Sequence, residues 1–294
     1  MKLNLRIHNR NHIIKNFIGN IEYLFSNSKL QNSHLTVVNY HGTQKSFIRN
    51  FRKQILFFKK NFFIISPELL TKFYNGELTD IEKPLMLITF DDGIKNNIYA
   101  AEVLYEYKIK AYFFIVPDFI DCPINKQKEY FRNYIRPKIN TAIDSQIEDY
   151  TALTWNEVNI LLSQGHSIGS HTKTHRLIAK QSTIENSITE IQLSKENIAS
   201  KLNMPLQSIN AFCSINNTLE SISNKELKLI KENYKFHFTT IPGQNYAESS
   251  PYFIKRANIE SYWLAGALKY AIGIWNLKRW TNATNAYLTI LNSK

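Results

Sequence analysis

The feature that most constrains the fold is a repeated alternation between short apolar segments and longer amphipathic ones. The apolar segments are rich in β-branched and aromatic residues, as buried strands are. They are LTVVNYH (35–41), LMLITFDD (85–92), AYFFIVP (111–117), HSIGSHT (166–172), NAFCSIN (210–216), KFHFTTI (235–241) and YFIKRANIE (252–260). Helical spacing predicts helices over 47–60, 67–74, 96–107, 154–164, 183–202 and 225–233. The pattern predicts an α/β fold with parallel strands, and about seven such units favour a barrel over an open sheet.

Three regions depart from this alternation. Residues 118–152 are polar and mixed, and we expect a loop that is either disordered or shapes the site. Residues 1–34 are predicted to form a basic helical extension in front of a barrel over 35–260. Residues 261–294 are predicted to form an amphipathic helical tail. Its aromatic, aliphatic and basic residues suit either an interfacial helix on an anionic membrane or a helix that closes the barrel, and we favour the latter.

The charge of the chain favours anionic partners but not nucleic acid. Lys and Arg number 36 against 24 Asp and Glu, a formal net charge of +12. No Arg-rich tract, zinc-finger spacing or Gly-rich phosphate loop accompanies this charge, so a nucleic-acid partner is not expected. Anionic lipid head groups and phosphate-bearing substrates remain as partners.

Sequence features bearing on location point to the cytoplasm. The two cysteines, Cys122 and Cys213, form no CxxC pair, which suits a reducing compartment. The basic N-terminal segment lacks the apolar run and the cleavage site of a secretory signal. No apolar stretch reaches the roughly 18 residues that a membrane-spanning helix needs. We therefore expect a cytoplasmic protein, with peripheral contact at the inner membrane face left open.

Two polar motifs follow predicted strands. In the first, Asp91, Asp92 and Gly93 come directly after an apolar strand. Active sites of parallel α/β folds form at the carboxyl ends of strands, although Asp-Gly is also common in turns. One carboxylate at such a position can bind a metal while its neighbour accepts a proton.

The second motif places His171 and His175 four residues apart after another strand. Two imidazoles at this spacing can converge on one ion, although no Glu follows His171 as in the HExxH motif. With one Asp they give three ligands and an open position, which is typical of a catalytic metal. Non-haem iron could use the same ligands but would leave the second carboxylate without a role. His166 stands apart from the pair, and we expect it to be structural.

Together the motifs resemble those of the polysaccharide deacetylases, the carbohydrate esterases with NodB homology. TFDDG and SHTxxH occur in the family's order, and the resemblance extends over about residues 35–260 through VVNYHGT, ISPELL, AYFFIVPDFID, TWNEVNILLSQGHSIGSHT and YKFHFTTIPG. It implies a distorted (β/α)7 barrel of the NodB type. It also implies that Asp91 is the general base and that Asp92, His171 and His175 hold a divalent metal, usually Zn²⁺, with Co²⁺, Ni²⁺ or Mn²⁺ as alternatives.

The chain departs from the family at its later motifs. The third motif often carries an Arg and a Pro-aromatic-Gly turn, whereas the aligned stretch here reads AFCSINN. The later Trp-containing motif and the late His that serves as general acid have no clear match. His41 and His237 are the candidates for the acid that protonates the leaving amine.

The function that the resemblance implies is hydrolysis of an N-acyl group, chiefly N-acetyl, from an amino sugar in a polysaccharide or its precursor. Because no secretion signal is evident, a nucleotide- or lipid-linked precursor fits better than a mature wall polymer. Two alternatives stay open at this point. One is a catalytically impaired barrel that binds sugar or regulates, and the other is a deformylase that acts on a lipid-linked sugar.

Overall fold

A computed structural model describes residues 17, 20, 21, 34–79, 81–137, 150–178, 182–215 and 222–272. Its centre is a mainly parallel sheet in the order β7-β6-β5-β4-β3-β1-β8. The strands are β1 (Leu35–Tyr40), β2 (Phe63–Ile64), β3 (Leu85–Phe90), β4 (Tyr112–Ile115), β5 (Ser167–Ser170), β6 (Ala211–Cys213), β7 (Phe236–Phe238), β8 (Gln244–Asn245) and β9 (Ala257–Asn258). Of the two not on that path, β2 pairs with β3 and β9 with β1, both in parallel, whereas β8 is antiparallel to β1. Each strand predicted from the sequence is present, and β2 and β8 are additions.

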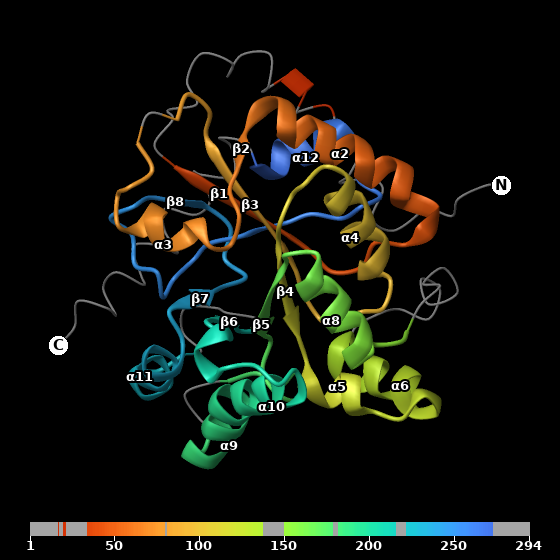
Figure 1. Cartoon of the computed structure of the whole chain (residues 1–294), viewed down its shortest axis with the longest axis vertical. Helices are drawn as coiled ribbons and strands as arrows, with labels where there is room; N and C mark the ends of the chain where they lie inside the picture. The colour runs from red at the N-terminus through yellow and green to blue at the C-terminus, as the bar shows by residue number, and fades with distance from the viewer. Residues whose placement is uncertain are drawn as a thin grey trace.

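The sheet curls into a half barrel with helices packed outside it (Figure 1), which confirms the predicted fold class. The main helices are α2 (Ile48–Asn61), α3 (Leu69–Tyr74), α4 (Asn97–Glu106), α8 (Trp155–Ser163), α9 (Ile184–Ile188), α10 (Ser194–Lys201) and α11 (Asn224–Asn233). Side chains cap the starts of α8, α9 and α11. Thr154 and Glu157 form a capping box at α8, and Ser223 and Glu226 form another at α11.

Alternate strand residues face two different apolar layers. Val38 and Ile88 belong to the layer between the sheet and the outer helices, which α2, α4 and α8 complete. Val37 and Leu87 belong to a second layer inside the curl. Because side chains alternate along a strand, the next inward positions towards the carboxyl ends are polar residues, Asn39 and Thr89. The interior therefore changes from apolar to polar at the carboxyl end of the sheet.

Residues 118–152, expected as a loop, are partly helical. They contribute to α5 (Pro117–Asp121), α6 (Ile124–Tyr130) and η2, a turn of π-helix (Phe131–Ile135). Phe119, Phe131 and Ile135 are buried and anchor the segment. Such sparse anchors among polar residues do not produce the continuous apolar stripe by which a helix is recognised in sequence. Residues 138–149 lie outside the described part of the chain.

The two predicted terminal extensions are only partly described. Residues 17, 20 and 21 are helical, and the rest of 1–33 lies outside the described residues. In the tail, α12 (Ala265–Ile272) packs against the barrel through Leu268 and Ala271. That stretch behaves as the closing helix we favoured, while residues 273–294 lie outside the described residues. Within the described ranges, no helix has the length and apolar character needed to cross a bilayer.

Candidate active site

Asp91 and Asp92 follow β3 at the polar end of the barrel, and each is about 1% exposed. The backbone N–H of Asp91 donates to the carbonyl of Tyr40, so Asp91 continues the pairing of β3 with β1. Asp92 then adopts a left-handed conformation with φ 73°, and Gly93 follows at φ 67°. Neighbouring side chains of a regular strand point to opposite faces, so this left-handed turn allows both carboxylates to reach one site. Asp91 Oδ2 and Asp92 Oδ1 lie 3.8 and 3.5 Å from the same atom, Nε2 of His171.

His171 follows β5, and both histidines of the second motif point their Nε2 atoms at Asp92. The Nδ1 of His171 lies 2.9 Å from the carbonyl oxygen of Cys213, and that of His175 lies 2.6 Å from the carbonyl oxygen of Tyr134. Because a carbonyl can only accept, each Nδ1 carries a proton, so each Nε2 would be the atom that presents a lone pair to a bound ion. The two Nε2 atoms lie 3.5 and 3.3 Å from Oδ1 of Asp92.

This geometry fits a divalent metal ion. Tetrahedral ligands about 2.1 Å from one ion lie about 3.4 Å from one another, which matches the separations of 3.3 and 3.5 Å. Burial alone would raise the pKa of Asp92, but His171 and His175 hold it well below its ordinary range. Its second oxygen, Oδ2, is buried and has no hydrogen-bond partner among the described residues. Asp92, His171 and His175 are therefore a suitable ligand set in charge, tautomer and spacing.

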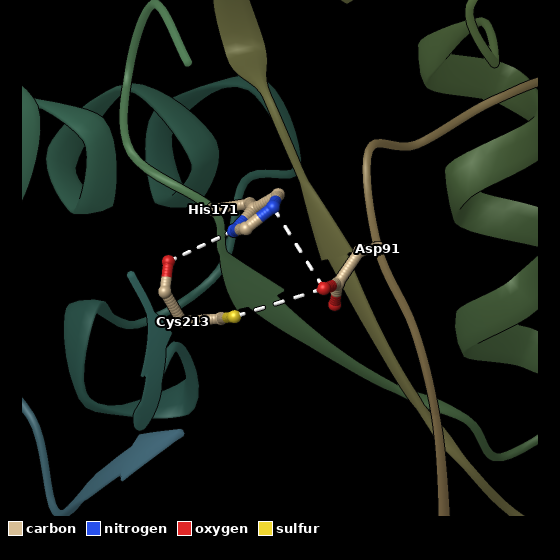
Figure 2. Close-up of side chains that lie close together, drawn as sticks. All are labelled: Asp91, His171 and Cys213. Atoms are coloured by element: carbon tan, nitrogen blue, oxygen red, sulfur yellow. Dashed lines mark hydrogen bonds and ion pairs between the residues drawn. The ribbon is translucent and has the colours of Figure 1, made fainter. Parts of the chain in front are cut away.

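A second group of side chains with ligand atoms consists of Asp91, His171 and Cys213 (Figure 2), whose ligand atoms lie within 4.8 Å of one another. A cation already occupies this side of the site. The Nη2 of Arg256 is 2.8 Å from the sulfur of Cys213, and the same guanidinium binds Asp91. A metal ion there would have to displace a buried arginine, so this group is a poor metal site.

Arg256 forms a two-pronged ion pair with Asp91. Its Nη1 and Nη2 donate to Oδ1 and Oδ2 of Asp91, both at 2.8 Å. The guanidinium also donates to Asn39, Thr89 and the carbonyl of Thr239, and the side chain is fully buried. Burial would raise the pKa of Asp91, but the charge of Arg256 lowers it below its ordinary value. Asp91 is thus ionised and fixed in orientation.

Arg256 is the residue that the sequence analysis missed. The third motif was expected to carry an Arg on the strand at 210–216, where this chain has none. The arginine comes instead from the segment just before β9, and β9 lies beside β1. A signal was present, because an Arg inside the predicted strand YFIKRANIE would be buried and would require an anionic partner.

The remaining histidines differ in their access to the site. His41 follows β1, and its Nδ1 lies 3.8 Å from Glu260, while Asp91, Asp92 and Arg136 act on its charge. Burial, followed by Arg136, lowers the pKa of His41 to about 4. Both ring nitrogens of His237 are occupied, Nε2 by Ser214 Oγ at 2.6 Å and Nδ1 by the carbonyl of Tyr252 at 3.0 Å. The structure therefore places His41 near the carboxylates and encloses His237.

His166 lies away from both groups. Its Nδ1 accepts from the backbone N–H of Ala111, and its ring packs edge-on against Phe113 at 5.0 Å. This placement agrees with the structural role expected for it.

The comparisons with known proteins agree with this fold. A family model described as polysaccharide deacetylase matches residues 79–230, just over half of the 294-residue chain, and includes both motifs. No curated protein sequence matches the chain.

Solved structures of deacetylases share the fold. A Streptococcus pyogenes deacetylase, PplD, in complex with acetate is 17% identical with a TM-score of 0.62, covering 83% of this chain and 100% of its own. IcaB from Ammonifex degensii is 16% identical with a TM-score of 0.60, covering 82% and 98%. A polysaccharide deacetylase from Bacillus cereus is 22% identical with a TM-score of 0.58, covering 81% and 69%. By sequence family, and with a matching fold, this chain belongs to the polysaccharide deacetylases.

Proposed function

We propose that this hydrolase of N-acetyl amide bonds uses a divalent metal ion held by Asp92, His171 and His175, with Asp91 as general base. The single observation that carries the proposal is the convergence of both histidine Nε2 atoms on one oxygen of Asp92, at 3.5 and 3.3 Å. Mixed imidazole and carboxylate ligands favour Zn²⁺, with Co²⁺, Ni²⁺ or Mn²⁺ as alternatives. A divalent ion in such a site acidifies water and polarises an amide carbonyl.

Asp91 is suited to take the proton from the attacking water. It is ionised, lies beside the ligand set, and its Oδ2 is 3.8 Å from His171 Nε2. Arg256 holds both carboxylate oxygens, so the base is oriented before substrate arrives. We therefore assign Asp91 as the base and Arg256 as its positioning residue.

His41 is the better of the two candidates for the group that protonates the leaving amine. His237 has both nitrogens engaged, whereas Nδ1 of His41 has no hydrogen-bond partner among the described residues. With a pKa of about 4, the imidazolium form of His41 is scarce at neutral pH but strongly acidic. Because a general acid works best with a pKa near the operating pH, this assignment rests on the position of His41 beside the carboxylates and not on its pKa.

We further propose that the substrate is an N-acylated amino sugar that bears phosphate, either nucleotide-linked or lipid-linked. Arg136, which is about one-third exposed, lies with its Nε 3.5 Å from Asp92 Oδ2. A partly exposed guanidinium at the edge of the ligand set can contact an anionic group of the substrate. The net charge of +12 supports the same class, and formyl in place of acetyl would use the same chemistry.

A membrane-bound form of that substrate would require peripheral contact. We propose that the part of the basic tail after α12 supplies it, because Lys278 and Arg279 stand there among aromatic residues. Sedimentation with vesicles that contain anionic lipid tests this contact, and no binding at low salt would remove it.

The impaired-barrel alternative loses part of its motivation. It rested on three departures at the later motifs: the missing arginine of the third motif, the missing Trp-containing motif and the missing late His. Arg256 answers the first of these, because it supplies a guanidinium to Asp91 from the segment just before β9.

The first experiment measures bound metal in the protein purified without added metal, for the wild type beside His171→Ala. About one divalent ion per chain in the wild type, lost in the variant, is expected for a three-ligand site. Acetate release from N-acetylated sugars is then compared with and without metal. Absence of metal from both proteins, even after Zn²⁺ or Co²⁺ is offered, would remove the metal-dependent mechanism.

A further inference from the structure

We infer that Glu190 is a positioning residue that fixes the loop between the two histidine ligands and so sets the affinity of the site for its metal. The inference rests on the proposed function, because it assigns a role towards the metal proposed there. Glu190 belongs to neither motif and follows His175 by fifteen positions.

The loop from His171 to His175 needs external support. Thr172 has φ 64° and His175 has φ 63°, so two residues with Cβ atoms adopt the left-handed conformation within one short loop. Each such residue is held at a cost of about 1 kcal/mol or more. A free loop would relax towards ordinary conformations and would turn the His175 ring away from Asp92.

Glu190 supplies that support on the N–H side of the loop. Its Oε2 accepts from the backbone N–H groups of Lys173 and Thr174, both at 2.9 Å, and its Oε1 accepts from the Thr174 hydroxyl at 2.5 Å. Three hydrogen bonds from the loop therefore converge on one carboxyl group. They fix the two residues that separate Thr172 from His175.

The carbonyl side of the loop is held by the segment after β4. Asp118 donates its backbone N–H to the carbonyl of Lys173 at 3.2 Å, and the Tyr130 hydroxyl donates to the carbonyl of Thr174 at 3.1 Å. Glu190 therefore completes a clamp whose other half comes from α5 and α6. Without it, two partly buried N–H groups would lose their acceptor.

The fold places Glu190 by a local irregularity in a helix. Residues Thr189–Leu193 form η3, a turn of π-helix between α9 and α10. A π-turn shifts the register of the helix and is frequent at functional sites. Glu190 is only 5% exposed, and a carboxylate is rarely buried unless its oxygens are satisfied. Among the described residues, its carboxyl oxygens accept hydrogen bonds only from Lys173 and Thr174, in the loop between the two histidines.

The test compares Glu190→Ala, Glu190→Gln and two controls. Both controls lie in α9, next to η3, and neither contacts the loop. Ser187→Ala removes a buried hydrogen bond to Glu226, and Glu185→Ala removes an exposed acidic side chain. The dissociation constant for Co²⁺ is measured by competition with a chelator, together with the absorption spectrum of bound Co²⁺ and the Tm of the metal-free protein.

Glu190→Ala is expected to raise the Co²⁺ dissociation constant about 10- to 100-fold, the usual effect of removing an outer partner of a metal site, and to alter the Co²⁺ spectrum. Glu190→Gln keeps an acceptor oxygen and should fall between Glu190→Ala and the wild type. Both controls should bind Co²⁺ as the wild type does, even if Ser187→Ala lowers the Tm. Unchanged affinity and spectrum in Glu190→Ala would overturn the inference.

A second readout does not depend on metal. Hydrogen exchange of the Lys173 and Thr174 amides is measured in the metal-free protein, and faster exchange is expected in Glu190→Ala but not in Ser187→Ala. If the wild type binds no Co²⁺, the metal-dependent function fails, while the exchange result still decides whether Glu190 orders the loop. Equal exchange in all variants would refute that ordering role.

Discussion

Asp91 and Asp92 are adjacent, equally buried carboxylates with opposite surroundings. Both oxygens of Asp91 accept hydrogen bonds, at 2.8 Å, from the buried guanidinium of Arg256. Asp92 faces two imidazole nitrogens at 3.3 and 3.5 Å, and its other oxygen has no hydrogen bond among the described residues. The contrast supports the two different tasks proposed for these neighbouring carboxylates. A carboxylate that is held by a buried cation has a fixed orientation and can accept a proton. A carboxylate whose lone pairs make few hydrogen bonds can bind a metal ion.

The largest effects should come from removing each carboxylate in turn. Asp91→Asn is expected to lower kcat/KM about 100- to 10,000-fold, the usual contribution of a general base, while bound metal is retained. Asp92→Asn is expected to lose metal, because the amide oxygen carries no charge for the ion. Acetate release and metal content are measured for both variants. Equal metal loss in both would mean that the two carboxylates do not divide the work.

Removal of the Arg256 guanidinium tests the ion pair that holds Asp91. Arg256→Met leaves Asp91 buried without its counter-charge, and a broken buried ion pair typically destabilises by about 3–5 kcal/mol. Urea unfolding of the metal-free protein measures this loss. The double variant Asp91→Asn with Arg256→Met should recover part of it, since no unpaired charge is left. If Arg256→Met alone were as stable as the wild type, the pair would not be the anchor of Asp91 described above.

The enclosed histidines give the molecule a pH dependence distinct from that of the carboxylates. Burial lowers the pKa of His237 and of His166 to about 4. The unfolded chain, in which a histidine has a pKa of about 6.5, therefore binds more protons below that pH. The contribution to stability is fully present above about pH 6.5 and is lost as the pH falls towards 4, by at most about 3 kcal/mol for each residue.

The measurement is the free energy of unfolding of the metal-free protein between pH 7 and pH 4. His237→Asn, which cannot titrate, should flatten the slope relative to the wild type. Asp91 and Asp92 act at lower pH, because their lowered pKa values place the loss of their contribution below about pH 4. A slope unchanged by His237→Asn would show that this residue is not the neutral buried group that its two hydrogen bonds indicate.

The sequence predicted the fold and the ligand-bearing motifs because both depend on local pattern. Buried strands, helical stripes and the positions of Asp91 and His171 after strands are each visible within a few residues. Arg256 was not predicted, because its relation to Asp91 arises from β9 lying beside β1 across more than two hundred residues of chain. The helical nature of Pro117–Ile135 was missed because its buried side chains, among them Phe119, Phe131 and Ile135, form no continuous apolar stripe in the sequence.

The smallest expected effect concerns Arg136, whose Nε lies 3.5 Å from Oδ2 of Asp92. Arg136→Gln should lower kcat/KM about tenfold for a phosphate-bearing probe such as UDP-N-acetylglucosamine, the usual value of a hydrogen bond to a charged group. A neutral N-acetylglucosamine oligomer should lose little. Arg132→Gln, an exposed arginine of the same segment, is the matched control.

The same substitution has an independent signature at His41. The charge of Arg136 is one cause of the lowered pKa of His41, after burial, so the pKa should rise in Arg136→Gln and stay unchanged in Arg132→Gln. An NMR titration of the His41 ring measures it. A rise in this pKa together with equal losses on the charged and neutral probes would mean that Arg136 tunes the site electrostatically rather than selecting the substrate. A loss of kcat/KM for the charged probe alone would instead indicate that Arg136 contacts an anionic group of the sugar substrate.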